Sequence, residues 1–206
     1  MSENTEFIES MEKHIESKLG EIHMVLHEKI SAHLHIDLYW VISEYIDEKY
    51  NYFITSGMSS LPMKVDDENK QFAELVIILP ENWKLDKESI QKEKHWWPLR
   101  LLKLLARYPH ENGTWIGEGH TIPLSSDLIK SSGFSAVMLH ECQSLSFEFE
   151  KLNYNNKTIN FYCIYPLYIE ELEYAYANGS DAMKELLLNN DYNDVLNVKR
   201  KNCIKK

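Results

Sequence analysis

The chain has 206 residues, with 22 Lys and Arg against 32 Asp and Glu, so its formal net charge is −10. This length fits one globular domain, and a 44% hydrophobic content can bury a sizeable core. The acidic balance disfavours nucleic acid as a partner, because phosphate binding needs a positive surface. No apolar run approaches the roughly 20 residues that cross a bilayer, and the first residues hold no hydrophobic signal core. We therefore expect a cytoplasmic protein with no membrane partner.

The three cysteines, Cys142, Cys163 and Cys203, are widely spaced and form no CxxC pair. This usage predicts a reducing compartment and no disulfide framework.

The N-terminal region carries a helical stripe of apolar residues from Ile8 to Ile30, at steps of three and four. We predict a helix of about 25 residues, or two helices separated at Gly20, because glycine weakens a helix interior. His23 and His27 are four residues apart, as in helical metal pairs, but no third ligand lies nearby, so a solvated face is the preferred interpretation.

Several segments are rich in β-branched and aromatic residues and are predicted to be strands. The segments 35–43 and 49–57 form a predicted antiparallel hairpin, and 72–80 is a continuous apolar run typical of a strand covered on both faces. Further strands are expected at 134–141, 144–152 and 160–168, the last two joined by a turn at Asn155-Asn156. In the second of these, Phe147 and Phe149 would share one face.

A buried helix is predicted from His95 to Arg107, with Pro98 in its first turn and Pro109 as its stop. Arg100, Lys103 and Arg107 form a narrow basic ridge along it. Such a ridge could hold an acidic partner, but more often it pairs with carboxylates of its own domain, here Glu74 or the acidic N-terminal helix.

The C-terminal region predicts a helix over 168–178 that stops at Gly179, and a second helix capped by Ser180. The basic tail 199–206 is predicted to fray. With no internal repeat, the order of elements indicates an α/β (α+β) single domain, with a mixed, largely antiparallel central sheet covered by helices.

The loop HENGTWIGEGH, residues 110–120, holds the chain's best candidates for chemistry. His110, Glu118 and His120 could meet as a metal-binding set of two histidines and one carboxylate, and Glu111 could add acid–base chemistry. Its glycines and Trp115 equally suit a rigid structural corner, which is the preferred interpretation. We therefore assign no catalytic, cofactor-binding or metal-binding residue.

Other catalytic patterns are missing from the sequence. There is no GxSxG elbow and no P-loop. Cys142 follows His140 and Glu141, but neighbouring side chains on a strand point to opposite faces, so no nucleophile pair is predicted.

The run WWPLRLLKLLARYPHENGTWIGEGHTIP resembles the signature of the Suppressor of fused (Sufu) domain family. The family's early strands and turn are similar to the upstream segments HIDLYWV, FITSGMSSLPM and AELVIILPENWKL. Its paired C-terminal helices, with the strand before them, are similar to the downstream segment FYCIYPLYIEELEYAYANGSDAMKELL, and its closing turn is similar to DVLN. The resemblance covers roughly residues 33 to 200. It divides the chain into an N-terminal helical segment (1–32), a Sufu-like domain (33–200) and a basic tail (201–206).

This resemblance implies protein binding rather than catalysis. Animal members hold Gli transcription factors between two domains, and bacterial single-domain relatives look like immunity proteins that neutralise polymorphic toxins, including LXG-type toxins. The expectation is an antitoxin with no cofactor, bound to a cognate and possibly basic, nuclease-like toxin. A peptide-binding scaffold that acts by strand addition and, less favoured, a metal-dependent hydrolase using His110, Glu118 and His120 remain as alternatives. The signature residues that could contribute to binding are Arg100, Arg107, His110, Trp115, Glu118 and His120.

Overall fold

The computed structural model describes residues 3–31, 34–43, 49–125 and 132–205. The helices of this part of the chain are α1 (Glu3–Leu19), α2 (Glu93–Asn112), α3 (Ile169–Asn178) and α4 (Ser180–Leu188). The strands are β1 (Ile22–Leu26), β2 (Asp37–Ile42), β3 (Tyr50–Ser56), β4 (Phe72–Pro80), β5 (Thr121–Pro123), β6 (Ala136–His140), β7 (Lys151–Tyr154) and β8 (Lys157–Leu167). Short 3₁₀ turns lie at Met58–Ser60 (η1), Glu68–Lys70 (η2) and Phe147–Phe149 (η3). None of these helices combines the length and the apolar character of a bilayer-spanning segment.

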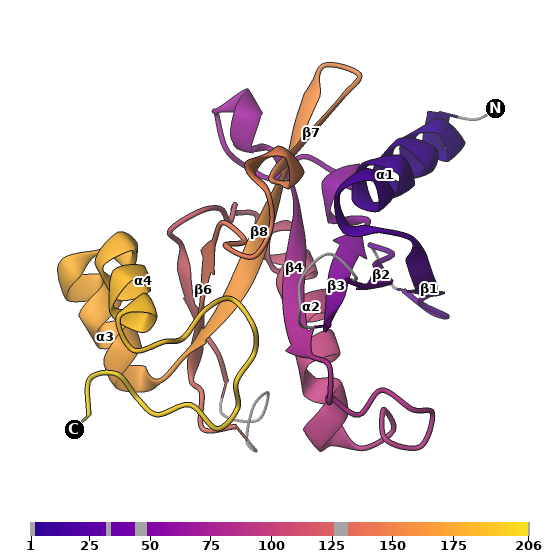
Figure 1. The fold of residues 1–206 in the computed structure, drawn as a ribbon. Coiled ribbons are helices and arrows are strands. Elements are labelled where there is room, and N and C mark those ends of the chain that lie inside the picture. Colours follow the sequence, from indigo (N-terminus) through magenta and orange to yellow (C-terminus); the bar gives the residue numbers. More distant parts are fainter. Residues whose placement is uncertain (1–2, 32–33, 44–48, 126–131, 206) are drawn as a thin grey trace.

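All eight strands belong to one sheet, in the order β1-β2-β3-β4-β8-β6-β5, with β7 paired to β8 beside this path. Among the described pairs, β4 and β8 run parallel and the others antiparallel. The predicted fold class, a mixed and largely antiparallel sheet covered by helices, is confirmed (Figure 1).

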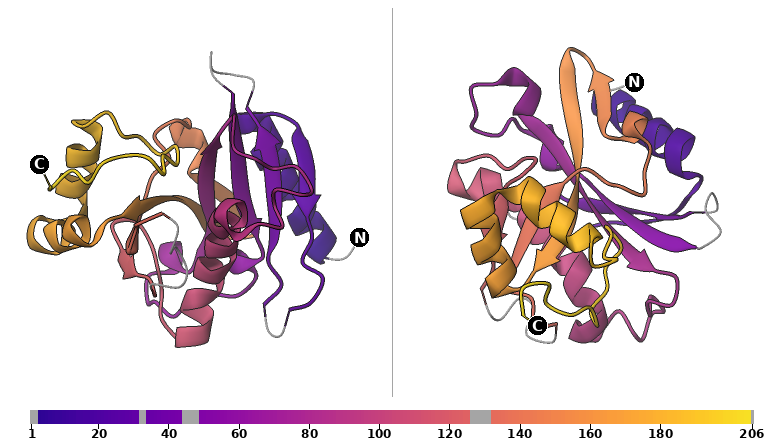
Figure 2. Two further views of the ribbon diagram at one scale, coloured as in Figure 1. Left: turned by 90° about the horizontal axis from the view of Figure 1, so that it is seen from below. Right: turned by 60° about the vertical axis from the view of Figure 1, so that its left-hand side comes forward.

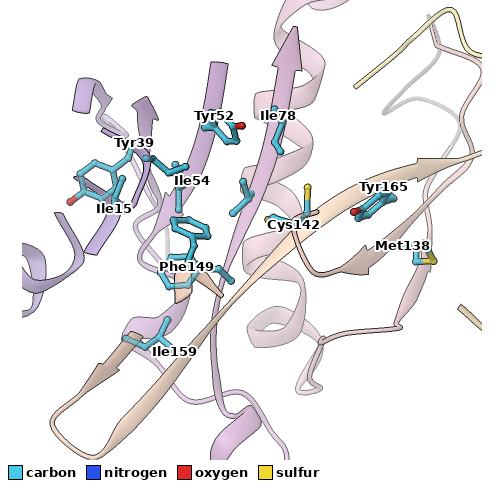
Figure 3. Packing of buried hydrophobic residues seen from close by; sticks show 14 of the residues in the cluster. Ile15, Tyr39, Tyr52, Ile54, Ile78, Met138, Cys142, Phe149, Ile159 and Tyr165 are labelled. Atoms are coloured by element: carbon cyan, nitrogen blue, oxygen red, sulfur yellow. The ribbon is translucent and has the colours of Figure 1, made fainter. Parts of the chain in front are cut away.

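The sheet divides the interior into two hydrophobic clusters, because alternate residues of a strand face opposite sides. On β4, Val76 and Ile78 belong to the cluster under α1, α3 and α4, whereas Leu75 and Ile77 pack with α2 on the other face. Two further views show the helices distributed around the sheet (Figure 2). Figure 3 shows the first cluster, in which side chains of α1, the central strands and η3 meet.

The N-terminal helix is shorter than predicted. It ends at Leu19, and Gly20 follows with a positive φ of 107°. The next residues form β1, which pairs antiparallel with β2, so the alternative of a second helix after Gly20 is wrong. His23 consequently lies on a strand, with its ring 4.6 Å from that of Trp40. On α1, Met11, Ile15 and Leu19 are buried in the core.

Helix α2 extends beyond both predicted ends. Pro98 lies in its second turn, and Pro109 lies inside the helix rather than ending it. A proline disfavours the helical region for the residue before it but does not forbid it. The helix ends at Gly113, whose left-handed φ of 58° is the conformation that a glycine cap adopts readily.

The predicted strands of the central region are present, with one exception. The hairpin of β2 and β3 is antiparallel as expected, although its connecting residues 44–48 lie outside the described residues. Asn155 and Asn156 have positive φ angles of 44° and 62° at the β7–β8 turn, as predicted. The segment 144–152 is not one strand, because η3 interrupts it; Phe147 is 77% exposed and Phe149 is fully buried, so they do not share a face.

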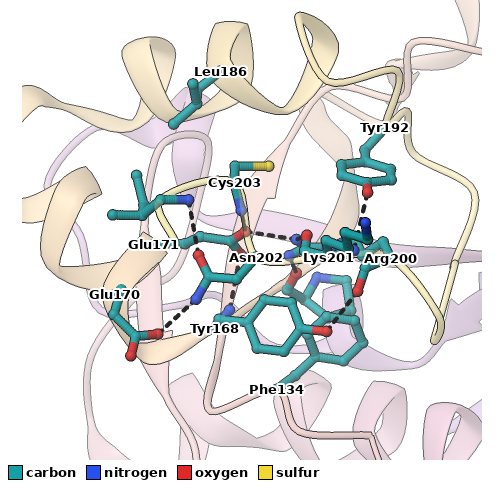
Figure 4. Close-up of polar contacts among 12 residues, drawn as sticks. Phe134, Tyr168, Glu170, Glu171, Leu186, Tyr192, Arg200, Lys201, Asn202 and Cys203 are labelled. Carbon is teal, nitrogen blue, oxygen red and sulfur yellow. Dashed lines mark hydrogen bonds and ion pairs between the residues drawn. The ribbon is translucent and has the colours of Figure 1, made fainter. Parts of the chain in front are cut away.

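The C-terminal tail is anchored, contrary to the prediction that it frays. The Arg200 guanidinium donates to both carboxylate oxygens of Glu171, at 2.6 and 2.5 Å, and to the Pro166 carbonyl oxygen at 2.7 Å (Figure 4). It also lies over the rings of Phe134 and Tyr168. The tail is therefore part of the folded domain.

The start of α4 also differs from the sequence-based expectation. Gly179, not Ser180, is its N-cap residue, and no side chain caps the helix. Gly179 thus both ends α3 and precedes α4.

Candidate functional site

The signature loop, residues 110–120, is tied to neighbouring elements at both of its ends. At its start, the His110 imidazole hydrogen-bonds through Nε2 to the Met58 carbonyl oxygen at 3.0 Å, which joins α2 to η1. At its end, the Gly119 amide donates to the Leu139 carbonyl, and the Leu139 amide donates to the His120 carbonyl, so the loop continues into the pairing of β5 with β6.

Trp115 and His120 pack against each other inside this loop, with ring centroids 4.2 Å apart. The Lys70 ammonium lies 5.5 Å from the centre of the indole ring. Gly117 is needed for this packing, because a β-carbon there would come within 2.8 Å of the Trp115 ring. The histidine side chains thus serve the loop's own structure.

The structure does not assemble His110, Glu118 and His120 into one ligand set. Burial lowers the pKa of His110 against the opposing effect of the Met58 carbonyl. Burial and then the charge of Lys70 lower the pKa of His120. Within the described residues, the group of His, Cys, Asp and Glu side chains close enough to share an ion includes Glu118 but neither of these histidines.

The basic ridge of α2 pairs with carboxylates of the same domain, as predicted. One of them, Glu28, lies in the acidic N-terminal segment that was expected to supply them, whereas Glu74 takes no part. Arg100 hydrogen-bonds to Glu93, and Arg107 to Glu28 and to the Leu34 carbonyl oxygen.

Glu74 lies on β4 and is fully buried, with its carboxylate directed into the turn after β3. Its carboxylate accepts hydrogen bonds from the Thr55 and Ser59 hydroxyls and from the amides of Gly57 and Ser59. Burial raises the pKa of this carboxyl although the four donors act in the opposite direction. The arrangement explains the TSGMS part of the sequence as a structural turn.

A second polar group forms around His140, the last residue of β6. Its side chain is only 5% exposed; Nδ1 lies 2.5 Å from Glu141 Oε2 and 3.5 Å from Glu118 Oε1. On the other side of the ring, Nε2 donates to Asp181 Oδ1 at 3.1 Å. The Lys184 ammonium bonds Glu141 and lies 3.3 Å from Nδ1. We call these five residues the His140 cluster.

The two glutamates of the His140 cluster have pKa values shifted in opposite directions. Burial and then a hydrogen bond with Glu141 raise the pKa of Glu118. Burial acts to raise the pKa of Glu141 as well, but hydrogen bonds from Lys184 and Glu118 outweigh it and hold that pKa at about 2. Glu141 is thus the carboxylate that keeps its negative charge, because the lysine stabilises it.

A groove of ≈ 730 Å³ opens beside both features. Its aromatic lining consists of Trp115, Phe147, Phe161 and Tyr162. Its charged lining consists of Glu118, Glu141, Glu150, Asp181, Lys70 and Lys151, so acidic groups outnumber basic ones. The chain thus presents an acidic groove with an exposed phenylalanine at its rim.

Sequence reasoning found one side of this groove and missed the other. It identified Trp115 and Glu118 but set His140 aside, because neighbouring strand residues point to opposite faces. Since β6 ends at His140, that alternation does not apply to Glu141, which turns back to the imidazole. No sequence spacing links these residues to the first two turns of α4, which supply Asp181 and Lys184.

Comparisons with known proteins agree with this architecture. Residues 32–201 match the sequence model of the Suppressor of fused protein (SUFU) family. The fold is similar to that of a SUFU homologue from Neisseria gonorrhoeae, with a TM-score of 0.66 and 14% identity over 98% of this chain and 97% of that chain. It is also similar to a chain of the Sufu-Fu complex (TM-score 0.67, 14% identity, 96% of this chain and 90% of that one). Drosophila Suppressor of Fused gives a TM-score of 0.61 at 15% identity, over 82% of this chain and 43% of its own. No curated protein sequence matched, but the family match spans most of the chain, which therefore belongs to the Suppressor of fused family.

Proposed function

We propose that this protein is an immunity protein, an antitoxin that binds a cognate toxin and blocks it by direct contact. Family membership supports a protein-binding role, since one structural relative is a chain of the Sufu-Fu complex. The resemblance to bacterial single-domain members supports a toxin as the partner. Of the described features, the one that carries the proposal is the acidic groove beside the signature loop.

Phe147 is the part of this groove that most favours a protein partner. Its side chain is 77% exposed, while Phe149 in the same 3₁₀ turn is fully buried. Exposed aromatic residues next to a concave polar surface are typical of the residues that dominate protein interfaces. A partner that covered Phe147 would remove its ring from water and reach the groove.

The charge of the groove favours a basic partner. Burial and then the charges of Glu141 and Glu118 raise the pKa of Glu150, which shows that these carboxylates repel one another. A cationic segment of the partner would relieve that repulsion, and the net charge of −10 would accelerate its approach. A nuclease toxin, which is basic because it binds phosphate, has this character.

The test is co-expression with the toxin-like product of the neighbouring gene, followed by purification of the complex and measurement of its Kd. We expect growth to be rescued and a stable complex to form. Phe147→Ala should weaken binding by about 2 kcal/mol, close to 30-fold. The matched control is Tyr176→Ala on α3, which is 64% exposed and outside the groove lining, and which should leave the Kd unchanged. Lack of both rescue and co-purification would contradict the antitoxin proposal.

A second candidate is peptide capture by strand addition at β1, an edge strand of the sheet. Beside this edge, Met24, Leu26 and Trp40 line an apolar hollow of ≈ 290 Å³, and Met24 is 47% exposed. Binding through this edge would be sensitive to Met24→Lys and insensitive to Phe147→Ala. The two variants therefore distinguish the two modes of binding.

A further inference from the structure

The His140 cluster has the composition of a metal site as well as that of an ion-pair network. Single ligand atoms of Glu118, His140 and Glu141 lie within 4.8 Å of one another. One nitrogen and two carboxylate oxygens form a mixed donor set, which differs from a group of surface acids because its imidazole is almost completely buried.

The orientation of the His140 ring suits a ligand role. The Asp181 carboxylate is an acceptor, so the nitrogen that faces it, Nε2, carries a proton. Asp181 thus holds the ring with Nδ1 directed at the two glutamates. Metal-binding histidines are usually oriented in this way, by a carboxylate or carbonyl on the opposite ring nitrogen.

A cation, the Lys184 ammonium, already lies against two of these three ligands, His140 and Glu141. It bonds Glu141 and lies 3.3 Å from His140 Nδ1, a nitrogen that also accepts the Glu141 amide at 3.0 Å. The site therefore stabilises positive charge, and an external cation would have to displace the lysine.

We propose that Glu118, His140 and Glu141 bind a Zn²⁺ ion in exchange for the Lys184 ammonium, with the remaining coordination position open to the groove. Two carboxylates and one neutral imidazole balance the charge of a divalent ion. The nitrogen donor favours zinc over magnesium or calcium, which prefer oxygen ligands.

The distances between these ligand atoms are compatible with this geometry after a small adjustment. Two ligands of a tetrahedral zinc ion lie about 3.4 Å apart when each bond is about 2.1 Å. The separation of His140 Nδ1 from Glu118 Oε1 is 3.5 Å, and that from Glu141 Oε2 is 2.5 Å. Binding therefore requires the Glu141 carboxylate to move outward by roughly 1 Å, which the release of Lys184 permits.

A rival set of ligands lies at the other end of the sheet. His27 and His35 contact Asp37 at 2.9 and 2.8 Å, through different carboxylate oxygens. Both imidazoles are largely exposed, and Asp37 also accepts the Glu28 amide. The experiment has to separate this set from the His140 cluster.

Titration of the chelator-treated full-length chain with zinc chloride in a calorimeter tests the proposal. We expect one ion per chain, and a loss of affinity of at least 10–100-fold in Glu118→Gln and in Glu141→Gln, the range known for even the outer partners of metal ligands. Lys184→Met should bind zinc more tightly than the wild type, because no ammonium competes. Glu173→Gln, which changes an exposed carboxylate of α3 outside both the groove lining and the ligand set, is the control and should bind as the wild type does.

Two results would overturn the proposal. One is the absence of zinc binding by both the wild type and Lys184→Met. The other is binding that survives Glu118→Gln and Glu141→Gln but is lost in His35→Asn, which would place the ion at the rival set. Both outcomes are independent of the toxin experiment, because they require only the isolated chain.

Discussion

The two polar centres around Arg200 and around His140 both pair basic side chains with carboxylates but differ in how they are enclosed. Arg200 forms a bidentate pair with Glu171, beneath aromatic rings and against the Pro166 carbonyl (Figure 4). In the His140 cluster the imidazole is buried, but Glu118 and Asp181 are exposed and line a groove. The enclosed pair holds the chain end to the domain, whereas the open cluster has carboxylates free to meet another molecule. Enclosure, more than composition, therefore separates a structural ion pair from a candidate site.

Arg200→Ala should have the largest effect on stability. It leaves the fully buried Glu171 carboxylate without its partner, which costs about 3–5 kcal/mol in comparable buried pairs. Chemical denaturation measures the free energy of unfolding. The control is Lys205→Ala, which removes a more exposed pair with Glu170 and should cost at most about 1 kcal/mol. Equal losses in the two variants would show that enclosure does not distinguish them.

The two phenylalanines of η3 offer the same comparison between apolar side chains. Phe149 is fully buried against Phe161 and His14, so Phe149→Ala should lower the free energy of unfolding by about 3–5 kcal/mol. Phe147→Ala should change it by less than about 0.5 kcal/mol, since the ring contacts water. Thermal melts of both variants check this. A large loss in Phe147→Ala would mean that this ring supports the fold rather than a partner.

The Glu28–Arg107 pair is intermediate between the two centres in its exposure to solvent, because its side chains are 15% and 17% exposed. Burial acts to raise the pKa of Glu28, but the Ile36 amide and Arg107 outweigh it, so the pKa lies below its usual value of 4.5. A lowered folded-state pKa stabilises the protein above pH 4.5, and this contribution is lost as the pH falls through the folded-state value. Glu28→Gln should therefore cost about 1.5 kcal/mol at pH 7 and progressively less below pH 4.5.

Unfolding of wild type and Glu28→Gln across this pH range checks the prediction. Glu93→Gln is the matched control, because its carboxylate pairs with Arg100 on the same helix but is exposed. It should lower stability by less than about 0.5 kcal/mol at any pH. A constant difference between wild type and Glu28→Gln would contradict the assigned pKa.

The sequence predicted the interior of the fold better than its connections. Continuous apolar runs such as Phe72–Pro80 gave the buried strands, because burial on both faces leaves little choice of residue. The strand Ile22–Leu26 was missed because its apolar residues also fit the helical period of α1, and pairing with β2 decided between the two. Pro109 was wrongly predicted to end α2, because the packing of this helix overrides the local preference of a proline.

The candidate site was predictable only where it is local in sequence. Trp115 and Glu118 lie in one conspicuous loop, so the sequence alone drew attention to both. His140 meets Asp181 and Lys184 only because α4 packs beside the end of β6, and that contact depends on the path of the whole chain. Long-range contacts of this kind leave no periodic signal in a single sequence.

Glu118→Gln should have the smallest effect on stability and gives the sharpest comparison of the two centres. The substitution keeps the shape of the side chain and removes a carboxylate that is repelled by Glu141. This side chain is more than half exposed. We expect the free energy of unfolding to change by less than about 0.5 kcal/mol, because an exposed site can exchange a lost contact for water. The same chemical change in Glu171→Gln should instead lower it by about 3 kcal/mol or more, since Arg200 would be left buried and uncompensated. Similar losses of unfolding free energy in both variants would show that the His140 cluster stabilises the fold as the Arg200 pair does. That result would contradict a binding role for the groove beside it.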